Sequence, residues 1–462
     1  MDWYAPIARH LVIPLYAALK GGTHGQSYAR RIAAWEFLSA DEIAERQWRK
    51  LERLLKHAYE NVPYYRRVFD ERGLRPRDIK DFDDLRKLPI LTKQDIRNHL
   101  PDLTARNIPG SELVDAFTGG TTGIPMHFKR DRRCRDMHWA SHAAFARWYG
   151  WRPGDPYAVV WGAPQDFARP SWRYRAAAYA MRRPLVLNAF RLADNDVKRF
   201  VLRLRRLRPT LLRGYTEAIR YVAEWAADHG VDLKVPAIAC TAEPLYDHQR
   251  KSIQALLGGE VFNEYGSREL GLIATECRRH RGLHVNMFTL RLEVLTEGGA
   301  PASPGEVGTL VATDLEAYGM PLIRYDTGDV AAWARHPCPC GLQHPLLAGL
   351  AGRQSALLVT ASGTVVSGHA LDHCVDVPAQ LQYVQSEDLS MEVRALPRNG
   401  FGPEHEAAIR DAVRTLLGDN VPVTVQKVAA IPRAPSGKYL FCESRAALVE
   451  SAGTSAAREP RK

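Results

Sequence analysis

The chain has 462 residues, 45% of them hydrophobic and 25% charged, and a formal net charge of +11. These fractions are near the averages of soluble globular chains, which excludes wholesale disorder and a fibrous class. The longest uncharged apolar run, Leu11 to Leu19, contains Pro14 and is shorter than the roughly 20 residues of a membrane-spanning helix. Composition therefore predicts a globular protein of about three folding units, at about 150 residues for each unit, that does not span a membrane.

The charge and the cysteines restrict the partners and the compartment. Basic residues are interleaved with Asp and Glu along the whole chain, and no helix-turn-helix, zinc-finger or RNA-binding signature accompanies them. We therefore expect no nucleic-acid partner. The seven cysteines are scattered, and we expect no secretory leader and a reducing, cytoplasmic compartment.

The first sixty residues have a helical pattern, with Trp48, Leu51 and Leu55 at helical spacing. Two interpretations of Leu11 to Leu19 stay open. The run is either a helix packed on the core, or part of a monotopic contact of residues 1–22 with a membrane surface. The second interpretation would place the protein at the inner face of the membrane.

From residue 155 onward, strand and helix patterns alternate. The pattern predicts strands at 157–161, 210–212, 235–240 and 261–265, and helices at 197–207, 217–229 and 248–257. Such alternation indicates parallel βαβ units. After Leu290 the segments 290–295, 308–313 and 322–325 are β-rich, and after Gly352-Arg353 short strands surround one helix, Pro403 to Leu417. The tail, 451–462, has almost no apolar residues and is expected to be disordered.

The densest motif is Thr118-Gly119-Gly120-Thr121-Thr122-Gly123, followed by Ile124-Pro125 and, a little later, Lys129. Glycines let a backbone approach a ligand closely, and hydroxyls and free N–H groups suit phosphate oxygens. The segment is thus a candidate phosphate loop. It is not a Walker loop, because Ile124 stands where that motif has its Lys.

Further segments follow in a fixed order. They are Thr241-Ala242-Glu243-Pro244-Leu245, Glu264-Tyr265-Gly266-Ser267-Arg268-Glu269, Arg324-Tyr325-Asp326-Thr327-Gly328-Asp329, Gly352-Arg353 and Pro432-Arg433-Ala434-Pro435-Ser436-Gly437-Lys438. This series resembles the adenylate-forming superfamily of acyl-CoA synthetases. More narrowly, it resembles the branch of phenylacetate-coenzyme A ligases and capsular-polysaccharide adenylate-forming proteins. The segments 61–66 (Asn-Val-Pro-Tyr-Tyr-Arg) and 88–93 (Leu-Pro-Ile-Leu-Thr-Lys) are similar to the capsular group.

The resemblance implies an α/β fold, with a large adenylate-forming domain (1–352) of mixed sheets flanked by helices. A small mobile α+β lid (353–450) and the tail (451–462) would follow it. It also implies roles for single residues. The loop 118–123 would hold the β and γ phosphates of ATP, with Glu243, Pro244 and Gly266 in neighbouring nucleotide-binding motifs. Tyr265 would stack on adenine, Asp329 would bind the ribose hydroxyls with Arg353 nearby, and Glu269 would bind Mg²⁺. Lys438 would contact the carboxylate and the α-phosphate.

The implied reaction is ATP-dependent activation of a carboxylic acid to an acyl-adenylate. Its second step would be transfer to coenzyme A, as in an AMP-forming acid–thiol ligase, or to a sugar or amine in polysaccharide synthesis. Trp161, Tyr215 and Phe288 are candidate walls of an aromatic acid pocket. Two rival interpretations remain. One is a non-catalytic nucleotide-binding protein, against which the presence of both Glu269 and Lys438 argues. The other is a membrane-associated scaffold of polysaccharide assembly that uses Leu11 to Leu19 and the basic surface. Where the family commonly has Ser or Thr, this chain has Arg268.

A separate set of residues has metal-ligating chemistry. Cys277, His280, His284, Cys338 and Cys340 could supply the three thiolates and one imidazole of a structural zinc site. The Cys-x-Cys spacing is tighter than the usual Cys-x₂-Cys, so unrelated buried thiols remain the alternative. Cys and Gly-Leu-His elements of the related branch favour His284 over His280.

Overall fold

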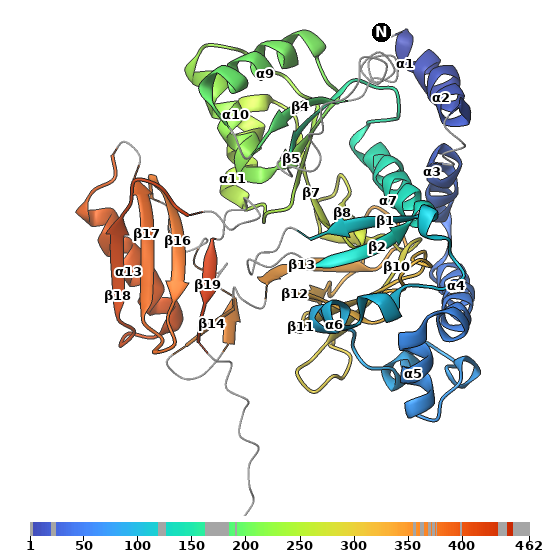
Figure 1. The fold of residues 1–462 in the computed structure, drawn as a ribbon. Coiled ribbons are helices and arrows are strands. Elements are labelled where there is room, and N and C mark those ends of the chain that lie inside the picture. Colours follow the sequence, from blue (N-terminus) through green and yellow to red (C-terminus); the bar gives the residue numbers. More distant parts are fainter. Residues whose placement is uncertain are drawn as a thin grey trace, which may run out of the picture. The chain divides into compact units, whose positions relative to one another are not determined.

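The computed structural model describes residues 3–19, 25–118, 126–161, 184–189, 192–353, 357–360, 365–367, 371, 375, 377–397, 400–432 and 441–446. Its chain divides into two compact units, whose main parts are Met1–Leu350 and Ala351–Ala434 (Figure 1). Among the described residues no helix is both long and apolar enough to cross a bilayer.

One large sheet organises the first unit. Its eleven described strands run in the order β10-β11-β12-β13-β9-β8-β7-β6-β5-β3-β4. The last five are mutually parallel: β7 (Glu260–Ser267), β6 (Ala237–Thr241), β5 (Leu211–Tyr215), β3 (Tyr157–Trp161) and β4 (Leu185–Asn188). Helices α9 (Asp194–Leu207), α10 (Thr216–Asp228) and α11 (Asp247–Leu257) connect and cover them (Figure 1). The predicted parallel βαβ units are confirmed.

The rest of the sheet is largely antiparallel. It contains β8 (Gly271–Glu276), β9 (Leu283–Val285), β13 (Leu346–Arg353), β12 (Tyr325–Trp333), β11 (Val307–Asp314) and β10 (Leu290–Leu295). The predicted strand at 322–325 is wrong, because β12 begins only at Tyr325. Arg324 has a left-handed φ of 52°, held by bonds from its guanidinium to Glu293 and to the carbonyl of Leu88.

Helices precede the sheet in the chain. They are α1 (Tyr4–Ile7), the π-helical turn η1 (Ala8–Val12), α2 (Ile13–Leu19), α3 (Gly25–Ala33), η2 (Ala34–Phe37), α4 (Ala40–Asn61), α5 (Pro63–Glu71), η3 (Pro76–Asp78), η4 (Asp83–Lys87) and α6 (Lys93–Leu103). The long helix α4 starts at a capping box of Ser39 and Glu42. Its apolar face, with Leu51, Leu54 and Leu55, lies in the main core together with residues of β8 to β12.

A hairpin, whose two strands flank the candidate phosphate loop in the chain, and the helix that follows it complete the first unit. After η5 (Gly110–Glu112), β1 (Leu113–Phe117) pairs antiparallel with β2 (His127–Asp131), and α7 (Arg132–Phe145) and η6 (Ala146–Tyr149) follow at once. Asp131 caps α7, because its side chain accepts the N–H of Cys134.

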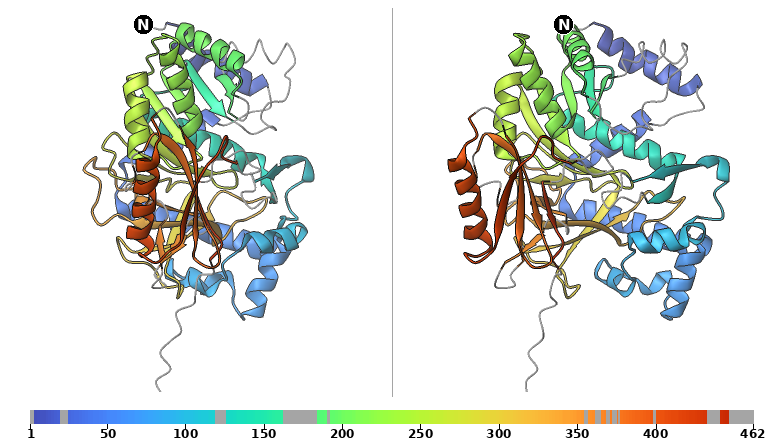
Figure 2. Two further views of the ribbon diagram at one scale, coloured as in Figure 1. Left: turned by 90° about the vertical axis from the view of Figure 1, so that its left-hand side faces the viewer. Right: turned by 60° about the vertical axis from the view of Figure 1, so that its left-hand side comes forward.

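The second unit is α+β. Its four-stranded sheet has the order β18-β17-β16-β19 and comprises β16 (Ala379–Gln385), β17 (Met391–Pro397), β18 (Val423–Lys427) and β19 (Cys442–Ser444). Helix α13 (Pro403–Leu417) lies along this sheet (Figure 2), and β14 (Leu357–Val359) pairs with β15 (Val365–Ser367). The helix predicted over 403–417 is confirmed.

Candidate functional site

Several of the expected motifs lie at the carboxyl ends of the parallel strands. β3 ends at Trp161, β5 at Tyr215, β6 at Thr241 and β7 at Ser267. All four strands run in the same direction, so these ends share one edge of the sheet. Ligands of open α/β sheets bind outside the carboxyl ends of the strands. This edge is therefore the candidate active site.

Thr118 closes the base of the candidate phosphate loop. Its N–H donates to the carbonyl of Met126, and the N–H of Met126 donates to Oγ1 of Thr118, both at 2.9 Å. These two bonds close the β1–β2 hairpin at the point where the candidate phosphate loop joins it. Gly119, Gly120, Thr121, Thr122 and Gly123 lie outside the described residues.

Tyr265 and Asp329 meet although they are far apart in the sheet order. The phenol of Tyr265 on β7 donates to Oδ2 of Asp329 on β12 at 2.6 Å. Three strands separate β7 from β12 in that order, so the sheet must curve to bring them together. The bond places the predicted adenine-stacking ring beside the predicted ribose-binding carboxylate.

Glu269 follows β7 and is 7% exposed. Its Oε1 accepts the phenol of the fully buried Tyr325 at 2.9 Å, and its Oε2 makes no hydrogen bond to any residue that the structure describes. Burial and the Glu269 carboxylate raise the pKa of Tyr325, so the phenol stays a donor. One fixed and one available carboxylate oxygen suit a hard cation such as Mg²⁺.

Gly266 and Glu243 shape the same edge. A Cβ at Gly266 would lie 2.6 Å from the carbonyl oxygen of Gly271, so glycine is required where β7 meets β8. The buried Glu243 accepts the N–H of Glu217 at 3.0 Å and so satisfies the first turn of α10. Pro244, next to it, is exposed. Glu243 thus caps the start of α10, and this role does not prevent it from lying near a bound nucleotide.

The structure does not describe the side chains of the two remaining predicted site residues, Arg353 and Lys438. Arg353 ends β13, and its backbone is described but its side chain is not. Lys438 lies outside the described residues. Their roles stay predictions.

Two basic residues near these motifs had no role assigned from the sequence. Lys93 donates to the carbonyl of Thr327 at 2.9 Å and so supports the turn that carries Asp329. A guanidinium nitrogen of the half-buried Arg130 on β2 lies 3.4 Å from Nδ1 of His138, and burial lowers the pKa of Arg130, with the Arg268 charge as a further cause. Lys93 ends a motif shared with the related branch, which was the available signal. For Arg130 the sequence carried none.

An aromatic pair also lies at the strand ends. The rings of Trp161 and Tyr215 are 5.1 Å apart, and the Arg213 guanidinium lies 5.1 Å from the Trp161 ring. Arg213 in turn donates to Glu264. Phe288, the third residue expected in an acid pocket, is elsewhere. It packs in the main core, with its ring 5.0 Å from that of Trp35, so its assignment to the pocket is wrong.

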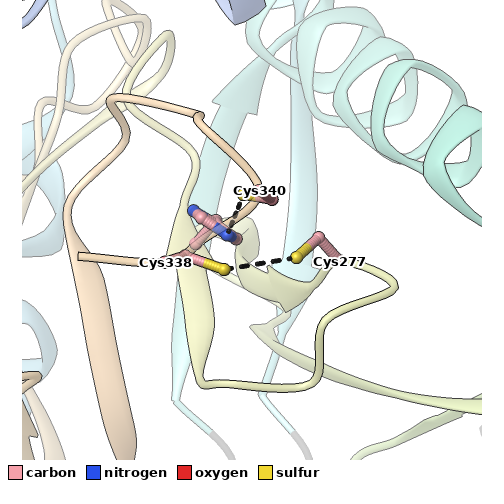
Figure 3. Close-up of side chains that lie close together, drawn as sticks. Cys277, Cys338 and Cys340 are labelled. Atoms are coloured by element: carbon pink, nitrogen blue, oxygen red, sulfur yellow. Dashed lines mark hydrogen bonds between the residues drawn. The ribbon is translucent and has the colours of Figure 1, made fainter. Parts of the chain in front are cut away.

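The cysteine-rich set converges at the other end of β8 and β9. The ligand atoms of Cys277, His284, Cys338 and Cys340 all lie within 4.8 Å of one another. Sγ of Cys277 is 3.6 Å from Sγ of Cys338, and Sγ of Cys340 is 3.4 Å from Nε2 of His284 (Figure 3). Adjacent ligands of a tetrahedral zinc ion are about 3.3–3.8 Å apart, given Zn–S of about 2.3 Å and Zn–N of about 2.0 Å. The donor set and its spacing fit zinc.

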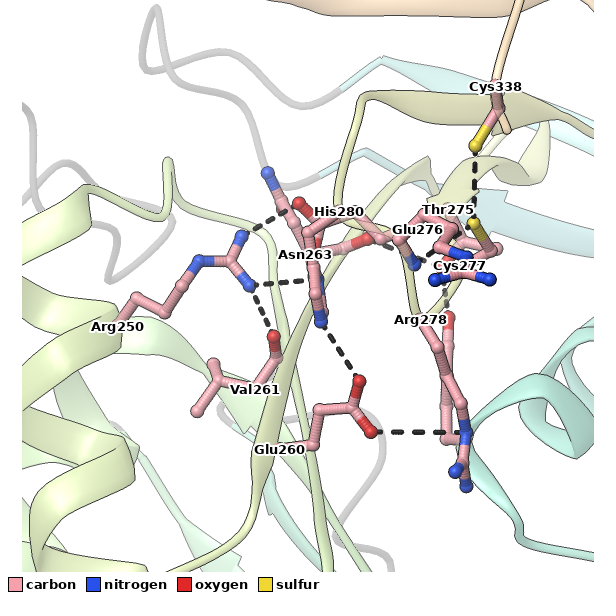
Figure 4. Close-up of polar contacts among 12 residues, drawn as sticks. Arg250, Glu260, Val261, Asn263, Thr275, Glu276, Cys277, Arg278, His280 and Cys338 are labelled. Carbon is pink, nitrogen blue, oxygen red and sulfur yellow. Dashed lines mark hydrogen bonds and ion pairs between the residues drawn. The ribbon is translucent and has the colours of Figure 1, made fainter. Parts of the chain in front are cut away.

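His280 faces away from this set. Its Nδ1 lies 3.0 Å from Glu276 and its Nε2 lies 3.1 Å from Glu260 (Figure 4). Arg250 joins the same network through Glu276. The Glu276 carboxylate raises the pKa of His280. The structure therefore places His284, and not His280, among the thiols.

Comparison with known proteins gives relatives over most of the chain, although no protein-family model matches it. A phenylacetate-coenzyme A ligase of Escherichia coli is 30% identical over 312 residues, which cover 64% of this chain and 68% of that protein. The phenylacetate-coenzyme A ligase of Thermus thermophilus is 27% identical, covering 86% and 94%. Protein CapK of Staphylococcus aureus is 23% identical, covering 87% and 89%.

Among solved structures, 2-hydroxyisobutyryl-CoA ligase in the postadenylation state is similar, with a TM-score of 0.73 at 21% identity. The alignment covers 88% of this chain and 91% of that one. At this identity the likeness establishes the fold, with its large mixed sheet flanked by helices.

Proposed function

This chain belongs to the phenylacetate-coenzyme A ligase family of adenylate-forming enzymes, and on that premise we propose that it activates a carboxylic acid with ATP and passes the acyl group to coenzyme A. In the first step a carboxylate oxygen attacks the α-phosphorus, and pyrophosphate leaves. In the second, the thiolate of coenzyme A attacks the acyl carbon, and AMP leaves. The observation that carries the proposal is that two hydrogen bonds join the β7 region to β12: Tyr265 binds Asp329, and Glu269, just after β7, binds Tyr325 at the start of β12.

The geometry and charge of these residues are compatible with the roles that the family resemblance implies. Asp329 would accept hydrogen bonds from the ribose hydroxyls through its carboxylate, and its bond to Tyr265 would hold the aromatic ring beside the nucleoside. Glu269 would hold Mg²⁺, which would neutralise phosphate charge as pyrophosphate departs. Thr118 anchors the hairpin turn proposed to bind the β and γ phosphates. Lys438 would stabilise the charge that develops between carboxylate and α-phosphate.

We expect Asp329→Ala to raise the KM for ATP by roughly 10- to 100-fold, because a charged acceptor of ribose hydrogen bonds contributes about 1.5–3 kcal/mol. Pyrophosphate exchange at varied ATP concentrations measures this KM. The matched control is Tyr265→Phe, which removes the phenol that binds Asp329 but keeps the ring. A KM for ATP that moves as far in Tyr265→Phe as in Asp329→Ala would mean that Asp329 only holds Tyr265 in place.

For the acid, we propose a pocket that includes Trp161 and Tyr215 and an aromatic substrate. Both rings stand at the carboxyl ends of their strands, on the edge that carries the nucleotide motifs. A panel of carboxylic acids scored by pyrophosphate release would identify the accepted acid.

The acceptor of the acyl group is tested once an acid supports pyrophosphate exchange. We expect added coenzyme A to give a thioester, seen by mass spectrometry, and to accelerate AMP release severalfold, because the thiolate opens a second route for the adenylate. If the adenylate forms and coenzyme A changes neither turnover nor product, the second candidate takes over. That candidate is a hydroxyl or amine acceptor in polysaccharide synthesis, favoured by the motif at 61–66 and the similarity to Protein CapK.

We further propose that Cys277, His284, Cys338 and Cys340 hold a structural zinc ion. Four protein ligands leave no open coordination position, which is typical of structural zinc sites. Burial raises the pKa of the Cys277 thiol to about 12, so a bound cation would have to displace its proton.

We also propose that residues 1–22 make a peripheral contact with a membrane surface.

A further inference from the structure

The N-terminal helix carries a stripe of exposed apolar side chains. Segments α1, η1 and α2 form one continuous helix, because Ala8 and Ile13 at their junctions have helical backbone angles (Figure 2). Trp3, Ile7, Leu11 and Leu15 follow one another at intervals of four residues and are 76%, 41%, 62% and 56% exposed. Single exposed apolar residues are ordinary, but four in register on one helix are not.

The π-helical turn keeps this stripe on one face. In an α-helix with 3.6 residues per turn, a four-residue spacing drifts by about 40° at each step. The turn Ala8–Val12 is wider, because π-helical bonds join residues five apart, and this width offsets part of the drift. Pro14 follows that turn and has no N–H to continue the α-helical ladder, which favours the irregular turn before it.

The opposite face of the helix is fixed to the first unit. Ala5 and Ala8 are buried, and a Cβ at Gly154 would lie 2.8 Å from the carbonyl oxygen of Ala5. Arg9 donates to the carbonyl of Pro153 and to Asp155, both at 2.8 Å. The helix is therefore held through one side, and its apolar stripe points away from that contact.

The sequence that contains the stripe has an excess of basic residues, which suits an anionic surface. Residues 1–35 contain four basic side chains (Arg9, Lys20, Arg30 and Arg31), of which Arg9 pairs with Asp155, and one acidic one (Asp2). Arg30 and Arg31 are exposed. Helices that lie in the plane of a membrane interface combine Trp and Leu on one face with Lys and Arg beside them.

We propose that Trp3, Ile7, Leu11 and Leu15 insert into the interfacial region of an anionic lipid bilayer and hold the protein on the membrane surface. The inference gives residues and a lipid class to the peripheral contact proposed above. It does not depend on the reaction, since lipid binding is measured without ATP or acid.

The experiment is flotation of the full chain with vesicles of phosphatidylcholine alone and of phosphatidylcholine with phosphatidylserine. We expect the wild type to float with the anionic vesicles and to be released by high salt. Leu11→Ser with Leu15→Ser should weaken partition by about 30-fold or more, because two of the four apolar side chains that insert into the bilayer are then replaced by polar ones. The control, Phe37→Ser with Val307→Ser, removes two exposed apolar side chains elsewhere and should float like wild type.

Three results would overturn the inference. The wild type could fail to float with anionic vesicles. The double serine variant could float as well as the wild type. Light scattering could show a dimer that the same variant dissociates, in which case the stripe binds a second copy of this chain. Circular dichroism checks that the variant is folded, and unchanged pyrophosphate exchange in it separates lipid binding from the ligase reaction.

Discussion

We expect Lys438→Ala to lower the rate of adenylate formation by roughly 10²-fold or more, equivalent to about 3 kcal/mol of transition-state stabilisation. Negative charge accumulates where the entering carboxylate oxygen and the leaving pyrophosphate meet at the α-phosphorus. A lysine ammonium at that place binds the transition state more strongly than the separated substrates. Pyrophosphate exchange with an accepted acid measures the effect directly.

A second lysine of the chain supplies the matched control. Lys427 on β18 pairs with Glu406 at 3.0 Å, within the second unit. Lys427→Ala removes an equal charge and should leave adenylation within about twofold, since partly exposed ion pairs contribute little. Wild-type exchange in Lys438→Ala would refute the assignment. A variant that forms adenylate normally but no longer makes thioester would move Lys438 to the second step.

The sequence predicted the fold best where burial alone decides structure. Tyr157–Trp161, Leu290–Leu295 and Pro403–Leu417 have the bounds that their patterns predicted. The run at 322–325 is equally apolar, yet Arg324 interrupts it. An arginine buried among apolar residues must find partners, and the nearest ones, Glu293 and the Leu88 carbonyl, lie in other segments. No local pattern contains that information.

The candidate site was predictable as a set of residues and not as an arrangement. Motif order identified Tyr265 and Asp329 separately, but their hydrogen bond depends on the curvature of a sheet in which their strands are not neighbours. Spacing likewise could not separate His280 from His284, because both follow Cys277 closely. The structure distinguishes the two histidines because Glu260 on β7 and Glu276 on β8 pair with His280, which leaves His284 beside the thiols. The assignment of Phe288 to the acid pocket was wrong because aromatic character alone does not distinguish a pocket wall from a core residue.

We expect Cys338→Ala to lose zinc and to lower the free energy of unfolding of the first unit by about 4 kcal/mol or more, because loss of a metal is among the few single changes with so large an effect. Cys277 and His284 lie on or beside β8 and β9, whereas Cys338 and Cys340 precede β13. An ion bound by all four joins segments more than fifty residues apart in the chain. Metal analysis of chelator-free protein and thermal denaturation measure the two effects.

Two variants separate loss of metal from loss of a buried side chain. Cys240→Ala also removes a fully buried thiol, but one outside the converging set, and should keep stoichiometric zinc. His280→Ala should keep it too, because His280 pairs with Glu260 and Glu276. A chelator should lower the melting temperature of the wild type and of both controls, and leave that of Cys338→Ala unchanged. If the chelator has no effect on the wild type and no zinc is found in it, the four residues are buried thiols and an imidazole that only pack together.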